Sequence, residues 1–163
     1  MAGFSPEGRV RVDYVATIAN IAAPDASSEL NTTTPLASVW LTPDGWGPAA
    51  NQNTVATTAL GSTYDTSVPG TQGGPITLKL KKDDTPASDT AWNLFKSGPS
   101  GFLVARYGQG GSAGAWTAGD KVMVFPGKAG KAQMEPTSSN TEQTFTVMWF
   151  PSTEPNLDAT VAA

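Results

Sequence analysis

Two adjacent acids and a neighbouring run of lysines are the densest group of side chains in this sequence that could do chemistry. Asp83 and Asp84 follow directly after Lys79, Lys81 and Lys82. The carboxylates could bind a cation and the lysines an anion, but a hard cation needs further oxygen ligands. None is placed nearby in the sequence, so a solvated turn before Thr85-Pro86 is the simpler interpretation. Asp120, which follows Gly119, is interpreted in the same way, as a turn residue that precedes a strand.

A glycine-rich segment over residues 108–113 (GQGGSA) fits the spacing of a dinucleotide-binding loop. Such a loop must lead into a helix, because the pyrophosphate binds at the helix N-terminus. The residues that follow, AWTAGDKVMVF, predict a turn and another strand instead. We therefore expect an ordinary flexible hairpin loop.

The sequence contains no histidine and no cysteine among its 163 residues. These absences exclude disulfides, thiolate nucleophiles, imidazole bases and the commonest metal ligands. Chemistry that uses only carboxylates, as in glycosidases, is the one enzymatic alternative left open. We predict no catalytic residue, no cofactor and no metal site, and we expect that the protein is not an enzyme.

The elements that must position these residues are mostly strands, with one helix at residues 88–98. Ser88 or Asp89 can cap this helix, and Gly98 can end it. Ile76–Lys82 alternates, and Gln143–Phe150 places Phe145, Val147 and Trp149 on one face. Further strands are predicted over these segments: Val10–Val15, Leu36–Leu41, Gly101–Tyr107, Lys121–Phe125 and, more weakly, Lys131–Glu135.

The first strand and the turn after the second carry specific expectations. In Val10–Val15, alternation places Val10, Val12 and Tyr14 on one face. Arg11 and Asp13 then fall on the other face, so we expect a half-exposed strand. The Pro-Asp-Gly sequence within Thr42–Gly47 predicts a tight turn.

A polar, threonine-rich segment at about residues 50–70 lacks the large apolar residues of a core strand. Because structureless loops of this length are uncommon in compact domains, we predict a long extended hairpin. Its strands would cover Thr54–Leu60 and Thr63–Val68, with the turn at Gly61-Ser62. A mobile loop is the alternative. Together these elements predict a mainly β fold, a sandwich or small barrel, in one domain over residues 1–163 with extended N-terminal and C-terminal arms.

Charge is low in total but unevenly distributed along the chain. The net charge is -4, while residues 1–70, 71–131 and 132–163 carry net charges of -4, +4 and -4. Tight phosphate binding is not expected without a basic excess. The block pattern favours head-to-tail association of subunits, with random surface scatter as the alternative. The N-terminus lacks the features of a signal peptide and no segment is long and apolar enough to span a membrane, so we expect a soluble chain made in a cytoplasm.

Three tryptophans lie in or beside predicted turns, where full burial is not expected: Trp40, Trp46 and Trp116. Such side chains could stack on sugars, as in a carbohydrate-binding module, or contact a neighbouring subunit.

Several segments, taken in order, resemble the major tail tube proteins of long-tailed bacteriophages, especially those of phages that infect actinobacteria. They are DTAWNLFKSGPSGFLVARYG, AWTAGDKVMVFPGKAG and TEQTFTVMWFPSTEPNLDATVAA, with GRVRVDYVATIANIAAP and LTPDGW near the start. The resemblance covers nearly the whole chain.

The resemblance implies a virion protein whose hexameric rings stack into a hollow tube. The tube would conduct double-stranded DNA from the capsid to the host. Partners implied are the tape measure protein, tail assembly chaperones, and the tail terminator and tail tip proteins, with assembly in the host cytoplasm and no membrane binding. A β-sandwich binding module, either a sugar binder or an Ig-like virion decoration domain, is the alternative.

Residues are assigned to roles in this assembly from pattern alone. Because the channels of this family are usually lined with acids, Asp65, Glu135 and Glu142 are the channel candidates. Candidates for contacts between subunits are Phe4, Trp46, Trp116 and, in the C-terminal tail, Val161. Lys79, Lys81 and Lys82 would be unfavourable in such a channel, and we expect them to face outward or to meet an acidic neighbour.

Overall fold

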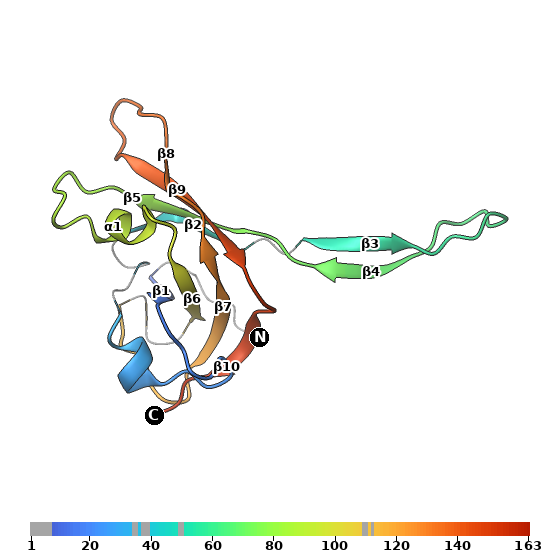
Figure 1. Ribbon diagram of the computed structural model, residues 1–163, viewed down its shortest axis with the longest axis horizontal. Coiled ribbons are helices and arrows are strands. Elements are labelled where there is room, and N and C mark those ends of the chain that lie inside the picture. Colours follow the sequence, from blue (N-terminus) through green and yellow to red (C-terminus); the bar gives the residue numbers. More distant parts are fainter. Residues whose placement is uncertain (1–7, 34–35, 37–39, 49–50, 109–110, 112) are drawn as a thin grey trace.

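The fold is a β-sandwich whose antiparallel strands form one continuous hydrogen-bonded sheet across both layers. The computed structural model describes residues 8–33, 36, 40–48, 51–108, 111 and 113–163. The strand order is β1-β6-β7-β9-β5-β2, with β10 beside β7 and β8 beside β9 (Figure 1). The bounds are β1 Val10–Val15, β2 Leu41–Pro48, β5 Ile76–Lys81, β6 Ser100–Tyr107, β7 Lys121–Ala129, β8 Gln133–Met134, β9 Thr144–Pro151 and β10 Asn156–Thr160.

Strand β7 joins the two layers of the sandwich. It pairs with β6 over most of its length, while its first residues pair with β10 and its last three with β9. At Gly127 the β9 backbone comes so close that an added Cβ would lie 2.4 Å from the Phe150 carbonyl oxygen. Only glycine fits here without moving a strand, so this position fixes how tightly the layers meet.

The main core lies between the layers and follows the predicted alternation. Ile76, Leu78 and Leu80 of β5 and Phe145, Val147 and Trp149 of β9 are all buried. They pack against Val12 of β1 and against β6, and Tyr14 contacts Trp149 edge-to-face with ring centroids 6.2 Å apart. Each such large apolar side chain contributes about 1.5–3 kcal/mol by leaving water.

Helix α1 (Thr90–Phe95) covers one side of this core. Asp89 caps it by accepting a hydrogen bond from the Trp92 amide at 3.3 Å, and the helix ends before Gly98. Phe95 is fully buried, and Trp92 meets Phe145 edge-to-face. The prediction of a capped helix in a β-rich sandwich is therefore confirmed.

A second, smaller core covers the outer face of β1, β6 and β7. Its cover includes a single helical turn, η1 (Ala26–Leu30), and the C-terminal residues beside β10. One prediction fails here, because helix 88–98 was expected to be the only one. In the C-terminal segment Ala159 and Val161 are buried, since β10 pairs with the edge of β7.

The Pro-Asp-Gly sequence forms part of a strand, and the predicted turn at Thr42–Gly47 is wrong. Strand β2 runs through it, with an irregular register against β5 between Leu41 and Trp46. An added Cβ at Gly45 would lie 2.3 Å from the Lys79 carbonyl oxygen, so the bulge presses the two backbones together. Of the strand expected over Leu36–Leu41, residues 37–39 lie outside the described residues, while Leu36 and Trp40 belong to a turn in which the Trp40 amide donates to the Leu36 carbonyl.

The sheet does not close into the small barrel that was the other predicted form. Among the residues that the structure describes, β1 and β2 end the strand order without pairing with each other. The long hairpin, by contrast, is confirmed. It consists of β3 (Gln52–Ala56) and β4 (Ser67–Gln72), and it extends away from the sandwich (Figure 1).

Candidate functional site: assembly surfaces and a buried polar cluster

The β3–β4 hairpin is a direct extension of two sandwich strands. Strand β2 leads into β3, and β4 leads back into β5, so the pairing of Pro48 with Ile76 continues as that of Gln52 with Gln72. Threonines hold the ribbon together through their side chains, as in the Thr57–Thr66 hydroxyl contact of 3.0 Å. At about 3.3 Å per residue, residues 52–61 project on the order of 30 Å.

The side chains of the hairpin are exposed and belong to neither core of the sandwich. Val55 and Val68, which are paired across the strands, are 52% and 47% exposed, and Tyr64 is 77% exposed near the tip. Leu60 at the tip is fully exposed. An isolated two-stranded ribbon is marginally stable in water, and the described residues of the same chain provide no further strand to cover this one.

Part of the outer face of β5 and β9 is also exposed. On β9, Met148 is 42% and Phe150 is 50% exposed, in alternation with the buried core residues. On β5, Thr77 is paired with Met148. Exposed apolar side chains on a regular sheet face favour a contact surface or a channel lining over simple solvation.

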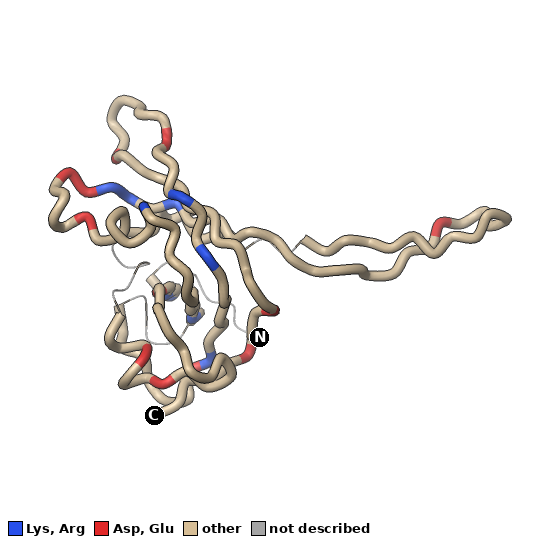
Figure 2. Tube along the Cα trace, viewed as in Figure 1, with Lys and Arg blue, Asp and Glu red and all other residues tan. Residues whose placement is uncertain are grey.

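Lys79, Lys81 and Lys82 of the basic run lie beside acids of the same chain. The Lys81 ammonium is 2.7 Å from the Glu142 carboxylate, and Lys82 pairs with the buried Asp89 while stacking over Trp92. A hydrogen bond from the Thr42 hydroxyl, one from its own backbone amide and the charge of Lys79 together hold the pKa of Asp44 below its usual value. Lys81 and Lys82 are therefore largely neutralised by acids of the same chain. Figure 2 shows basic and acidic residues next to each other at this end of the sandwich.

A groove, which we call the end groove, lies at the end of β2 and β5 opposite the hairpin. Its volume is about 710 Å³, and it combines two lysines, three acids and two apolar side chains. The lining residues are Trp40, Lys81, Lys82, Asp83, Asp84, Met134, Glu142 and Gln143. Asp83 and Asp84 stay at this solvated turn, as predicted, and Asp83 accepts hydrogen bonds from the Thr85 amide and the Ser88 hydroxyl.

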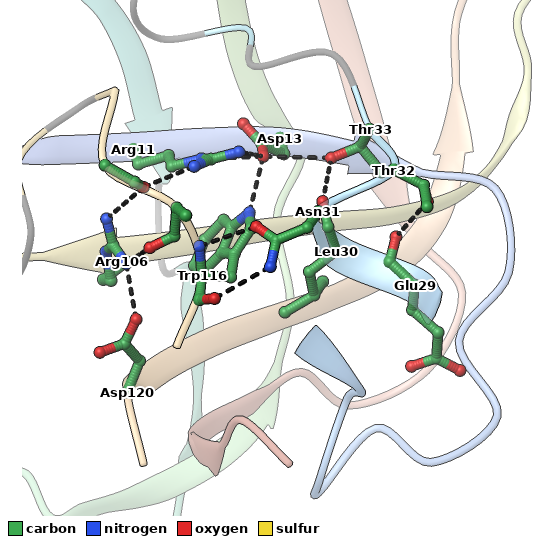
Figure 3. Close-up of polar contacts among 12 residues, drawn as sticks. Arg11, Asp13, Glu29, Leu30, Asn31, Thr32, Thr33, Arg106, Trp116 and Asp120 are labelled. Atoms are coloured by element: carbon green, nitrogen blue, oxygen red, sulfur yellow. Dashed lines mark hydrogen bonds and ion pairs between the residues drawn. The ribbon is translucent and has the colours of Figure 1, made fainter. Parts of the chain in front are cut away.

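A buried polar cluster lies beneath the second core, at the other side of the sandwich (Figure 3). One oxygen of Asp13, Oδ2, accepts hydrogen bonds from Arg11, from the Trp116 indole at 2.8 Å and from the Thr33 hydroxyl at 3.1 Å. Asn31 holds the Trp116 backbone from both sides, at 2.9 and 3.0 Å. Arg11 and Asp13 are 4% and 0% exposed, so the half-exposed first strand predicted from alternation is wrong.

A second ion pair completes this cluster. Arg106 is 1% exposed and lies 2.6 Å from Asp120, while its guanidinium also donates to the carbonyls of Gly111, Gly114 and Ala115. Both arginines stack on the Trp116 ring, with guanidinium carbons 4.8 and 4.9 Å from its centre. Burial tends to raise the pKa of Asp120, but hydrogen bonds from Thr117 and Arg106 outweigh it and hold the pKa below its usual value. These groups are engaged with one another, so the cluster anchors the loop before β7.

The residues predicted to contact neighbouring subunits differ in how far the structure exposes them. Trp116 and Val161 are each 2% exposed, so neither side chain offers a surface to a neighbour. Trp46 is half-buried, donates its indole N–H to the Tyr107 hydroxyl and meets Phe125 edge-to-face. Phe4 lies outside the described residues. The expectation that turn tryptophans stay exposed therefore fails for Trp116.

The three channel candidates lie in separate places. Asp65 is exposed near the hairpin tip, Glu135 accepts a hydrogen bond from the Thr146 hydroxyl on β9, and Glu142 pairs with Lys81. Glu135 and Glu142 both lie near the start of β9, whereas Asp65 lies between β3 and β4 in the hairpin.

The buried cluster was missed from sequence, although a signal for it exists. Arg11, Asp13 and Arg106 are the charged residues of otherwise apolar strands, and Asp120 opens the strand that follows a tryptophan-containing loop. Opposite charges at such positions can form ion pairs under a covering loop, so they are as consistent with a buried face of the strand as with a solvated one.

Among the described residues, no group of three or more acids is arranged to hold a metal, and no helix there is long and apolar enough to cross a membrane.

Comparisons with known proteins match these features. The family model described as "Phage tail tube protein" matches residues 2–163. The fold is also similar to that of a chain in the six-fold symmetrised cryo-EM structure of the anti-feeding prophage baseplate. The TM-score is 0.57 at 9% identity, and the match covers 96% of each chain. No curated protein sequence matches the chain.

The β-sandwich, its exposed β3–β4 ribbon and the family match together support a structural role in the phage tail. The chain belongs to the phage tail tube protein family. The resemblance stated from the sequence is therefore confirmed at the level of the family. The likeness to the baseplate chain, at 9% identity, supports the fold.

Proposed function

We propose that copies of this chain assemble into hexameric rings that stack into a hollow tube, and that the tube conducts double-stranded DNA from capsid to host. The observation that carries this proposal is the β3–β4 hairpin, whose side chains are exposed over its whole length. Membership of the tail tube family supports a structural role in the phage tail. We assign the chain to the tails of long-tailed, siphovirus-type phages, with no enzymatic activity.

The distribution of charge supports passage of DNA without retention. The net charge is -4, and two of the three clustered lysines form ion pairs within the chain. DNA binding depends on unpaired cations that replace counterions. We therefore propose that acids face the channel, with Glu135 a better candidate than Glu142, whose charge is offset by Lys81, and with Asp65 on the hairpin as the third.

Partners follow from the same proposal. The tube would assemble around a tape measure protein and end against tail terminator and tail tip proteins, first in the host cytoplasm and finally in the virion. Contacts between subunits would use the hairpin, the exposed face of β9 and the segment around Phe4. Trp46 would contribute through its exposed part.

The alternative, a sugar-binding or decoration module, has less support from this fold. A sugar platform needs tryptophan faces open to solvent, whereas Trp116 is buried and Trp46 is held against Tyr107 and Phe125. Trp40, the third of these tryptophans, is half-buried in the end groove, which leaves a single partly exposed ring and no extended platform of tryptophans there.

A hairpin-deletion variant tests the proposal. Replacing residues 51–73 with Asn-Gly would connect β2 and β5 by a short turn and leave the core untouched. We expect a monomer that unfolds at nearly the wild-type temperature and forms no rings or tubes in sizing chromatography and electron microscopy. A variant that still forms tubes would refute the role of the hairpin, and an unfolded variant would show that the hairpin serves the fold.

A further inference from the structure

We propose that the end groove accepts the tip of the β3–β4 hairpin of a second copy of this chain. The inference rests on the proposed self-assembly and adds the acceptor site to it. It concerns the tip residues Leu60 and Tyr64 on one copy and Trp40 and Met134 on the other.

The topology places the hairpin and the end groove at opposite ends of the same strands. The hairpin leaves β2 and β5 beyond the pair Pro48–Ile76, while the groove opens beyond the pair Leu41–Leu80. In Figure 1 the ribbon and the β8 end of the sandwich point in opposite directions. A copy shifted along the strand direction therefore directs its hairpin at the groove of the next. This contact is heterologous, because one copy contributes its hairpin and the next contributes its groove. The same contact can therefore be repeated from copy to copy.

The tip and the groove have matching apolar chemistry. Leu60 and Tyr64 are the most exposed large apolar side chains of the chain's described residues. The groove offers Met134, which is 47% exposed, and the half-buried Trp40. Aromatic and methionine side chains pack well against each other, and methionine adapts to irregular gaps.

The groove lining carries three acids and two lysines, so the tip enters with its apolar side chains while Asp65, which has the same charge as Asp83 and Asp84, stays outside. Lys81 and Lys82 are paired with Glu142 and Asp89, so the groove does not need an anionic ligand. The hairpin carries one charge, Asp65, and many hydroxyl groups. The Asp83 and Asp84 carboxylates can accept hydrogen bonds from those hydroxyls.

The size of the hairpin favours a folded domain as its partner, and the position of the groove at the opposite end of the same strands is the reason for assigning that role to a second copy of the chain. A standard protein interface uses about 20–30 residues on each side. The exposed segment 51–73 provides about that number by itself. A ribbon covered over this length needs an acceptor as large as a folded domain, with the end groove receiving only its tip.

Engineered disulfides test the inference directly, because the chain has no native cysteine. A chain carrying Tyr64→Cys is mixed with one carrying Met134→Cys, assembled and mildly oxidised. A disulfide requires Cα atoms within about 7 Å, so it reports the contact itself. Met148→Cys on the β9 face and Leu157→Cys on β10 are matched controls, since Met134, Met148 and Leu157 are 47%, 42% and 59% exposed.

We expect Tyr64→Cys to cross-link with Met134→Cys at least tenfold more than with either control. Tubes that cross-link through Met148→Cys or Leu157→Cys instead would overturn the groove as acceptor and leave the proposed function standing. Tubes with no cross-link to Met134→Cys would do the same. A strictly monomeric protein would overturn both.

Discussion

Removing the Asp13 carboxylate is expected to destabilise the protein strongly. In Asp13→Ala the Arg11 guanidinium stays buried, at 4% exposed, without its counter-charge. The Trp116 indole also loses its acceptor. Breaking a buried ion pair by removing one partner costs about 3–5 kcal/mol. For a chain of this size that corresponds to a fall in melting temperature of roughly 6–20 °C.

Thermal and urea unfolding of the purified subunit measure this change. Asp13→Asn keeps an oxygen that can accept a hydrogen bond, so its cost is expected to be smaller, about 1–3 kcal/mol. Asp158→Ala is the control, because Asp158 and its partner Lys121 are both exposed and such pairs contribute about 0–1 kcal/mol. If Asp13→Ala unfolds within about 1 kcal/mol of the control, the buried cluster does not hold the loop before β7.

Three further outcomes are expected. Gly127→Val should cost at least about 1–3 kcal/mol in urea unfolding, because its side chain would overlap the β9 backbone; wild-type stability would contradict the close approach of the layers. The pKa of Asp120 is lowered in the folded state, so its stabilisation is present above the unfolded pKa of about 3.9 and is lost as pH falls through the folded value. Asp120→Asn should therefore show a flatter loss of stability below about pH 4, and equal slopes would refute this. Glu142→Gln breaks the exposed pair with Lys81 and should change the free energy of unfolding by less than about 1 kcal/mol, a result that melting curves check.

The parts of the fold that sequence predicted are those where local pattern and tertiary packing agree. Alternation in Ile76–Lys81 and Thr144–Pro151 gave the correct core faces, because one side of each strand is buried and the other is exposed or half-buried. The cap at Asp89 and the stop at Gly98 are local signals as well. The hairpin was predicted, although its paired strands end farther from the tip than expected.

The failures come from contacts made by distant segments. Alternation placed Arg11 and Asp13 correctly on the face opposite Val12, but sequence did not show that a later loop covers that face. Trp116 belongs to this loop and is buried against the two arginines of the covered face. The Pro-Asp-Gly signal at Thr42–Gly47 was overridden by pairing of β2 with β5. Contact and channel residues were the hardest to predict, because they depend on subunits that the single chain does not contain.

Electron microscopy of the purified full-length chain tests the central claim most directly. The hairpin has no partner among the described residues of its own chain, and the chain belongs to the tail tube family. We therefore predict rings or tubes with a central hole as concentration rises, and six-fold symmetry in their averaged end views. Monomers without rings at any concentration, or solid filaments without a central hole, would contradict the proposal that this chain builds a conduit.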